Sequence, residues 1–412
     1  MKLAVFVDQF PVISQTFVLN QVDGLIAQGI DVTVIALSDP RANVLSHDVT
    51  SAQNEMVKKT VIYLLDEEND SLWRKFLKRA CKLMPKLLWG ANRKRILSAL
   101  NLYYGHHAKS LLLPTIVSNI DDPLAFDFII CHFGTGGVLI NKLRDIGVIA
   151  GKIATIFHGF ELSIDKTLAQ QKDNYLQLFE QTELMLPISE LWKNKLKLLG
   201  CPSDKIAVHR MGVDLRHFAF KYTKMRGDTL SIFTVARFTE KKGLEYAIRA
   251  LALLTNDIKF HYTIAGFGEL LQPLKLLVNE LALDDYVSFI GAIDSVQVKE
   301  QMLAAHAFIQ PSITASNGDM EGVPVAIMEA MAMGTPVISS YHSGISELIT
   351  HGEHGLLAQE KDSLALAENI RLLYKNEPLQ KRLAIQARKR IEEFADIDRL
   401  NKQLLVLLNK HQ

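Results

Sequence analysis

Two glutamates, Glu321 and Glu329, stand eight positions apart in the segment 319–336 and could supply carboxylate chemistry. Pro324 suits the first turn of a helix and Gly334 suits its end, so Glu321 would lie in the preceding loop and Glu329 inside the helix. The residues around Glu329 are apolar on nearly every side, and a carboxylate in such surroundings needs a partner. The two hydroxyls of a ribose would be suitable donors. The alternative is a glutamate on a solvated helix face.

The same segment offers a binding place for a phosphate. An apolar run over 307–310 predicts a strand, and a polar loop over 312–319 follows it, so that strand, loop and helix succeed one another. The first turn of a helix carries backbone N–H groups without partners inside the helix, and such groups bind anions. We therefore expect the N-terminus of this helix to point at a bound phosphate.

Two cations follow another predicted strand. Arg237 comes directly after the apolar run 230–236, and Lys242 precedes Gly243, where a helix is expected to begin. Cations at the carboxyl end of a parallel strand can grip a pyrophosphate through charge-assisted hydrogen bonds. The alternative is a solvated basic turn, which is common in proteins.

His158 follows the apolar run 153–157, and Gly159 permits a tight turn there. A side chain at the carboxyl end of a strand faces the cleft in which α/β proteins bind ligands, although a single histidine is more often structural.

Gly266 and Gly268 follow a further predicted strand. They lack the third glycine of a dinucleotide-binding fingerprint and are weak support for NAD binding.

Short apolar runs alternate with longer amphipathic segments, which predicts an α/β fold with parallel sheets and right-handed crossovers. The runs that we interpret as strands are 3–7, 31–37, 128–131, 153–157, 184–187 and 206–209 in the first half, and 230–236, 261–265, 287–291, 307–310 and 337–339 in the second. We expect two Rossmann-like, doubly wound domains, 1–218 and 219–395, that face each other across a cleft. A last helix within 396–412 follows, and whether it packs back on the first domain is left open.

The glutamate pair carries a family resemblance. Glu321, seven residues, Glu329 and then the sequence Gly-Thr-Pro-Val at 334–337 resemble the paired-glutamate motif of the retaining GT-B glycosyltransferases of family 4, also called glycosyl transferases group 1. The resemblance implies the GT-B fold, with the C-terminal domain holding a nucleotide-sugar donor. It implies that Glu329 binds the ribose of the nucleotide and that Glu321 contacts hydroxyls of the transferred sugar. The amides of Gly322, Val323 and the neighbours of Pro324 would face the sugar and phosphate.

The remaining motifs take roles from the same resemblance. Arg237 and Lys242 resemble the family's diphosphate clamp, which neutralises the leaving group where other enzymes use a metal, so we expect no metal and no cofactor. His158 resembles the histidine that contacts the transferred sugar and its phosphate. Gly266 and Gly268 match a glycine turn near the nucleotide base. The donor would be UDP- or GDP-linked.

The N-terminal loop 8–17 lacks the glycine-rich sequence of many family members. It resembles instead the Phe-Pro-x-x-Ser-x-Thr-Phe pattern of an exopolysaccharide or colanic-acid-type subgroup. Ser14 suits the N-cap of the first helix. The functional alternative places Ser14 and Thr16 at the acceptor or phosphate side of the cleft, and the two interpretations have equal weight.

The composition excludes several classes of protein. The chain has 412 residues, 48% of them hydrophobic, and a net charge of +1, so it is globular and has no general attraction to nucleic acid. Its three cysteines are odd in number and far apart, which indicates a reducing compartment. No uninterrupted apolar run approaches the length of about 18 residues that a spanning helix needs. We expect a cytoplasmic protein.

One region departs from this charge balance. Residues 71–120 hold ten Lys and Arg and no Asp or Glu. On a helix in this region Trp73, Phe76, Leu77, Ala80 and Leu83 can share a face, as in an interfacial helix on anionic lipid. The alternative is a core-packing helix with a solvated basic face. The missing acids favour peripheral contact of residues 71–100 with the inner face of the plasma membrane.

Together these features predict a retaining transferase that moves a hexose from a nucleotide-diphosphate sugar to a hydroxyl of a glycan or lipid-linked acceptor in cell-surface polysaccharide synthesis. Two alternatives share the architecture. A sugar-nucleotide epimerase would interconvert sugars without an acceptor, and a non-catalytic partner subunit would have lost the clamp. The presence of Arg237, Lys242 and both glutamates disfavours the partner subunit.

Overall fold

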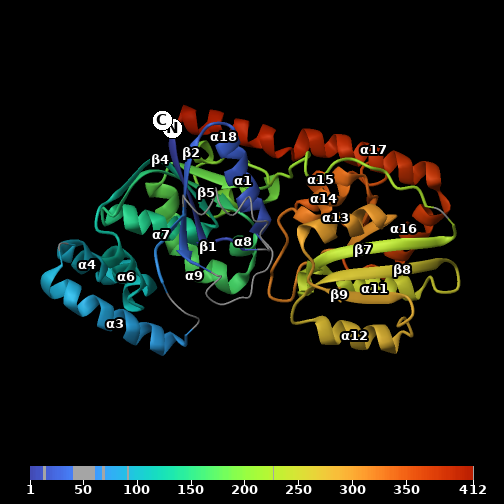
Figure 1. The fold of residues 1–412 in the computed structure, drawn as a ribbon, viewed down its shortest axis with the longest axis horizontal. Helices are drawn as coiled ribbons and strands as arrows, with labels where there is room; N and C mark the ends of the chain where they lie inside the picture. The colour runs from blue at the N-terminus through green and yellow to red at the C-terminus, as the bar shows by residue number, and fades with distance from the viewer. Residues whose placement is uncertain (13–14, 40–60, 67–69, 91, 226, 412) are drawn as a thin grey trace.

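The computed structural model describes residues 1–12, 15–39, 61–66, 70–90, 92–225 and 227–411. It forms two lobes, each built on a six-stranded parallel sheet (Figure 1). The α/β prediction of two doubly wound sheets is therefore confirmed. The expected extended segment 206–209 is wrong, because it forms only an isolated bridge between Ile206 and Met185.

The first sheet has the order β3-β2-β1-β4-β5-β6. Its strands are β1 (Lys2–Gln9), β2 (Asp31–Ser38), β3 (Val61–Tyr63), β4 (Leu124–His132), β5 (Ile149–Phe157) and β6 (Leu184–Pro187). The helices of this lobe are α1 (Thr16–Ala27), α3 (Leu72–Trp89), α4 (Arg93–Ala99), α5 (His106–Lys109), α6 (Leu112–Asn119), α7 (Gly134–Asp145), α8 (Phe160–Ser163), α9 (Asp165–Gln181) and α10 (Glu190–Leu198). Short 3-10 turns cover η3 (Leu102–Tyr104) and η4 (Ser203–Lys205).

The second sheet has the order β12-β11-β10-β7-β8-β9. Its strands are β7 (Thr229–Arg237), β8 (Lys259–Phe267), β9 (Val287–Gly291), β10 (Ala307–Gln310), β11 (Val337–Ser340) and β12 (Leu356–Ala358). Its helices are η5 (Glu240–Lys242), α11 (Leu244–Ala252), α12 (Leu271–Glu280), α13 (Ser295–Ala304), α14 (Val325–Met333), α15 (Ile345–Leu348), α16 (Ser363–Lys375) and α17 (Glu377–Phe394). The chain ends in α18 (Ile397–Lys410).

Both sheets have the same topology, because each begins at a central strand, winds outward and then crosses to the other side. The crossing lies between β1 and β4 in the first sheet and between β7 and β10 in the second. Ligands of doubly wound sheets bind at the carboxyl ends of the strands at this switch point. The strands are apolar along their length because helices cover both faces of a parallel sheet, and all four residues of β10 and of β11 are buried.

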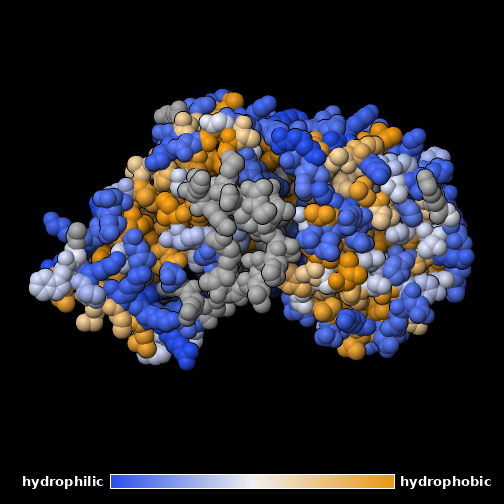
Figure 2. All heavy atoms as spheres, viewed as in Figure 1, coloured by the Kyte–Doolittle hydropathy of each residue, from blue (hydrophilic) through white to orange (hydrophobic). Residues whose placement is uncertain are grey.

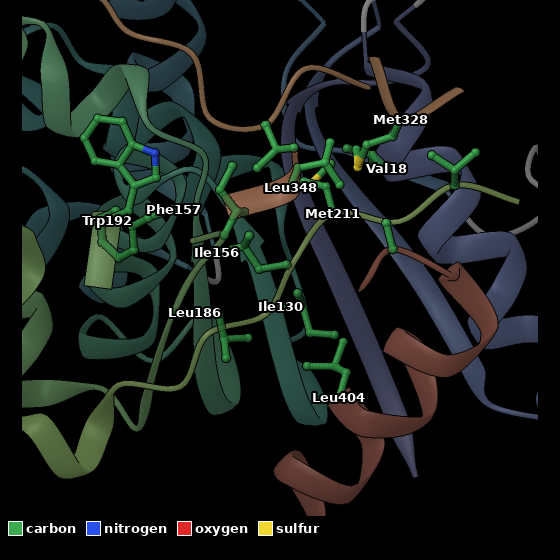
Figure 3. Close-up of a cluster of buried hydrophobic side chains, with 14 of the residues drawn as sticks. Val18, Ile130, Ile156, Phe157, Leu186, Trp192, Met211, Met328, Leu348 and Leu404 are labelled. Atoms are coloured by element: carbon green, nitrogen blue, oxygen red, sulfur yellow. The ribbon is translucent and has the colours of Figure 1, made fainter. Parts of the chain in front are cut away.

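One hydrophobic core runs through both lobes. Figure 3 shows Ile130 and Phe157 of the first sheet in the same cluster as Met328 of α14 and Leu348 of α15. The helices α17 and α18 run along the top of both lobes, and α18 packs against α1 of the first lobe (Figure 1). The two lobes are therefore joined by shared packing as well as by the chain connection at 218–228.

We expect Leu404→Ala in α18 to destabilise the protein, because the Leu404 side chain is fully buried between α18 and the first lobe. Truncation of a buried leucine costs about 2–5 kcal/mol. Val406 lies two residues further along the same helix and is 56% exposed, so Val406→Ala is the matched control. Thermal unfolding of the three proteins checks this, and equal midpoints for all three would show that α18 is not held by this contact.

Candidate active site

Glu321 lies between two lysines at the carboxyl end of the second sheet. The Lys242 Nζ is 3.0 Å from Glu321 Oε1, and the Lys241 Nζ is 3.9 Å from the same oxygen and 3.0 Å from Asp319 Oδ1. The side chains of Glu321, Lys241 and Lys242 are all largely buried. Burial raises the pKa of Glu321, but Lys242 and Lys241 outweigh it and hold the pKa below its ordinary value. The carboxylate is therefore ionised and paired.

A single glycine brings Lys242 to this position. Gly243 has a φ of 64°, and a Cβ at this residue would lie 1.9 Å from the carbonyl oxygen of Pro311. The turn after β7 can therefore lie directly against the loop after β10, which carries Glu321. Any side chain at residue 243 would push these two loops apart.

Arg237 ends β7 and is exposed beside this pair. The neighbouring end of β8 carries Gly266 and Gly268, with φ values of 134° and 154°. A Cβ at Gly266 would lie 1.8 Å from the Ala236 carbonyl oxygen, and one at Gly268 would lie 2.6 Å from the Phe238 carbonyl oxygen. These two glycines let the end of β8 approach the backbone of Ala236 and Phe238, the residues on either side of Arg237.

Glu329 lies in the second turn of α14, and Gly334 ends this helix with a φ of 85°. Its side chain keeps partial exposure, and burial raises its pKa to about 7. No hydrogen bond or ion pair reaches its carboxylate from the described residues.

The placement of Pro324 in the first helical turn is wrong, because Pro324 occupies the N-cap and α14 begins at Val325. Gly322, Val323 and Pro324 form the entrance to the helix.

His158 lies in the first lobe, directly after β5, with its ring between Phe17 and Phe133 at centroid distances of 4.9 and 4.5 Å. Its Nε2 is 3.0 Å from Nδ1 of His132, which ends β4. Burial, with a smaller contribution from His132 and His209, lowers the pKa of His158 well below its ordinary value. Both rings are neutral, because burial also lowers the pKa of His132 to about 3.

The turn after β5, which carries His158, is held by the carboxylate of Glu161. Glu161 accepts hydrogen bonds from the His158 and Gly134 backbone amides, and burial raises its pKa to about 7.

His132 was not among the residues predicted from the sequence, although it stands at the carboxyl end of a predicted strand just as His158 does. That position is the signal by which it could have been found.

The two halves of the site touch. A Cβ at Gly322 would lie 2.5 Å from the His158 carbonyl oxygen and 2.3 Å from Cδ1 of Ile188. The Met320 backbone amide donates to Ser163 Oγ at 3.1 Å. The glutamate loop of the second lobe therefore rests on the turn after β5, and this contact brings the glutamate loop next to the backbone of His158.

The N-terminal loop reaches this region through Phe17. Thr16 begins α1 and is exposed. Gln15 occupies the N-cap position of α1, without a side-chain hydrogen bond, and the interpretation of Ser14 as a cap stays a prediction. Ser14 itself lies outside the described residues.

Comparison with known proteins assigns the family. The sequence profile described as "Glycosyl transferases group 1" matches residues 217–390. The chain is 39% identical over 411 residues, 99% of each chain, to the "Putative colanic acid biosynthesis glycosyltransferase WcaL" of Salmonella typhimurium. It is 42% identical over 393 residues, 95% of each chain, to the "Amylovoran biosynthesis glycosyltransferase AmsK" of Erwinia amylovora. The chain therefore belongs to the group 1 glycosyltransferases and is a transferase of that family.

Solved structures agree with this fold. Anabaena HepE in complex with UDP and glucose has a TM-score of 0.72 at 17% identity, and the lipopolysaccharide outer core galactosyltransferase WaaB has a TM-score of 0.65 at 17% identity. Each alignment covers 100% of both chains. The GT-B prediction is confirmed.

The partly buried carboxyl group of Glu329 predicts a pH-dependent stability. Its pKa of about 7 exceeds the ordinary value of 4.5, so the folded state holds this proton more tightly than the unfolded chain. The destabilisation is absent below about pH 4.5, grows as pH rises, and is complete above about pH 7.

We therefore expect Glu329→Gln to raise the thermal midpoint relative to the wild type at pH 8, by roughly a few degrees, and to change it little at pH 5. Thermal unfolding at the two pH values measures this difference. Glu280→Gln, at an exposed carboxyl group in α12, serves as the control. A gain that is the same at both pH values would contradict the assignment.

Proposed function

We propose that this glycosyltransferase moves a hexose from a nucleotide-diphosphate sugar to a hydroxyl of a glycan or lipid-linked acceptor in cell-surface polysaccharide synthesis, with retention of the anomeric configuration. The observation that carries the proposal is the Glu321–Lys242 pair at the switch point of the second sheet, with Arg237 beside it. The acceptor class rests on the relatives named for colanic acid and amylovoran biosynthesis.

The second lobe supplies the groups for the donor. Arg237 and Lys242 would bind the diphosphate, together with the backbone amides at the start of α14, because positive charge there stabilises the leaving nucleoside diphosphate. This arrangement needs no metal ion or cofactor. The carboxylate of Glu329, without a partner among the described side chains, would accept hydrogen bonds from the ribose hydroxyls. Gly266 and Gly268 would border the base.

The reaction exchanges one bond to the anomeric carbon for another. The acceptor oxygen forms a bond to this carbon while the bond to the diphosphate oxygen breaks, and the acceptor proton passes to the departing phosphate. Attack and departure on the same face of the sugar retain its configuration. Glu321 would orient the sugar hydroxyls, and His158 would contact the sugar as a neutral hydrogen-bonding group. Arg237 and Lys242 would lower the energy of the charged leaving group.

Removal of either clamp cation tests this assignment. We expect Lys242→Ala and Arg237→Ala each to lower kcat/KM by about 10²–10³-fold, because each deletes a positive charge that faces the leaving diphosphate. The measurement is release of nucleoside diphosphate with and without acceptor. Lys275→Ala, at an exposed lysine of α12, should leave the rate unchanged.

The same assay separates the transferase from a sugar-nucleotide epimerase. Release that depends on acceptor supports transfer, whereas isomerisation of the donor sugar without acceptor would establish the epimerase. Full activity in both cation variants would remove Arg237 and Lys242 from the proposed clamp.

The basic helix α3 supports a membrane-facing partner. Trp73, Leu77, Met84 and Leu88 are all at least 46% exposed and follow one another at helical spacing along a single stripe. Leu83 is buried where α3 packs against α6, so the exposed stripe is a separate face from the packed one. The expected common face of Trp73, Leu77 and Leu83 is therefore wrong.

Basic side chains flank this stripe, and Arg74 and Lys82 are exposed among them. Figure 2 shows hydrophilic and hydrophobic residues side by side over α3, at the lower left of the view. In the described part of the chain no helix is long and apolar enough to cross a membrane. We propose that the α3 stripe rests on an anionic membrane at its cytoplasmic face, where a lipid-linked acceptor would be presented.

Sedimentation with vesicles tests the membrane proposal. We expect the protein to bind vesicles that contain phosphatidylglycerol and to bind much less to pure phosphatidylcholine, because the lysines and arginines need anionic lipid. Trp73→Ser combined with Leu88→Ser should weaken binding by about tenfold or more, since two apolar anchors are lost. Leu198→Ser, at a leucine that is 85% exposed in α10, is the control. Equal binding of the double variant and the wild type would contradict the proposal.

A further inference from the structure

The backbone around Glu321 is held by the three residues 342–344, which follow β11. The Glu321 amide donates to Nε2 of His342 at 3.0 Å, and Ser343 Oγ donates to the Glu321 carbonyl oxygen at 2.6 Å. The Gly344 amide donates to the Gly322 carbonyl oxygen at 3.2 Å. The peptide groups on both sides of the Glu321 Cα are therefore tied to one neighbouring loop.

His342 is itself fixed. Its side chain is fully buried, and its Nδ1 lies 2.6 Å from Oε1 of Glu360. Because Nε2 accepts from the Glu321 amide, the ring proton must be on Nδ1, and His342 donates it to Glu360. The second oxygen of Glu360 accepts from the Thr314 amide at 2.8 Å. The Glu360 carboxylate thus orients the ring, and the ring orients Glu321.

The chain of contacts joins the loops after three adjacent strands. Thr314 follows β10, His342 follows β11 and Glu360 follows β12, and these strands are neighbours in the sheet. Their carboxyl ends meet at the same edge as the Lys242 turn. A displacement of the Glu321 backbone by about 1 Å would disrupt its 3.0 Å contact with Lys242, and misplacement on this scale costs an enzyme about 10²-fold in rate.

We propose that His342, oriented by Glu360 and assisted by Ser343, is a positioning residue that holds Glu321 at the distance its function in sugar transfer requires. The proposal rests on the role given to Glu321 under the proposed function. His342 does not meet the substrate. It acts by fixing the loop from which the Glu321 carboxylate extends.

Replacement of His342 tests the proposal. His342→Leu removes both hydrogen-bonding atoms and should lower kcat by about 10²-fold with a smaller change in the KM for the acceptor. His342→Gln keeps an acceptor for the Glu321 amide and a group that can reach Glu360, and it should restore most of the rate. Ser343→Ala, which removes a single hydrogen bond and little volume, should lower kcat several-fold and serves as the second variant if His342→Leu does not fold.

His351→Leu is the matched control. His351 Nδ1 also accepts a backbone amide, that of Leu357 at 2.9 Å, in the same lobe, but no hydrogen bond joins the described His351 to Glu321. Loss of this bond should lower the thermal midpoint without lowering kcat. A fall in kcat of His351→Leu as large as that of His342→Leu would show a general effect on folding and overturn the proposal.

A double-mutant cycle with Glu321→Gln separates this proposal from the proposed function. If His342 acts through Glu321, His342→Leu should cost little further rate in the Glu321→Gln background. Full activity of Glu321→Gln would remove the proposed role of Glu321 and the positioning role with it. An inactive Glu321→Gln beside a fully active His342→Leu, or equal losses from His342→Leu in both backgrounds, would overturn the positioning role alone.

Discussion

The buried ion pair between Glu321 and Lys242 is the interaction around which the second lobe is arranged. Removing two charges from water costs several kcal/mol for each ion, and only close geometry with further hydrogen bonds offsets this cost. The structure meets that requirement with a distance of 3.0 Å, a second lysine, and backbone bonds to the glutamate loop. Loops that follow three different strands meet at this one residue: its own loop after β10, the Lys242 turn after β7, and the 342–344 loop after β11, which bonds the Glu321 backbone. Such convergence is available at the carboxyl edge of a parallel sheet, where every strand delivers its loop to the same side.

The two sides of the candidate site differ in charge. Its second-lobe side carries three cations, Arg237, Lys241 and Lys242, against the carboxylates of Glu321 and Asp319. Its first-lobe side carries the neutral rings of His132 and His158 among phenylalanines. Under the proposed function, a dianionic leaving group would be stabilised on the charged side, while the acceptor hydroxyl would meet neutral surroundings. The contact between the glutamate loop and the turn after β5 brings these two environments together, and the core shared between the lobes supports that contact.

Close approach of backbones makes this arrangement possible. Gly243 allows the lysine turn to touch the loop after β10, and Gly266 allows β8 to touch the end of β7. Both residues have positive φ, and neither position has room for a Cβ. Gly243, where the sequence predicted the start of a helix, and Gly266, which the resemblance placed near the nucleotide base, thus set the distances in the second-lobe half of the site.

The sequence by itself determined the alternation of strands and helices, the two parallel sheets, and the placement of Arg237, Lys242, His158 and Glu321 after strands. These features follow from local hydrophobic pattern and from the rule that side chains at carboxyl ends line the cleft. Only the tertiary structure decided which side chains meet. His342 and Glu360 carry no local motif, and the three-residue strands β3 and β12 are too short for a periodic signal. Pairing of loops from distant strands depends on sheet order, which the chain establishes only when it packs.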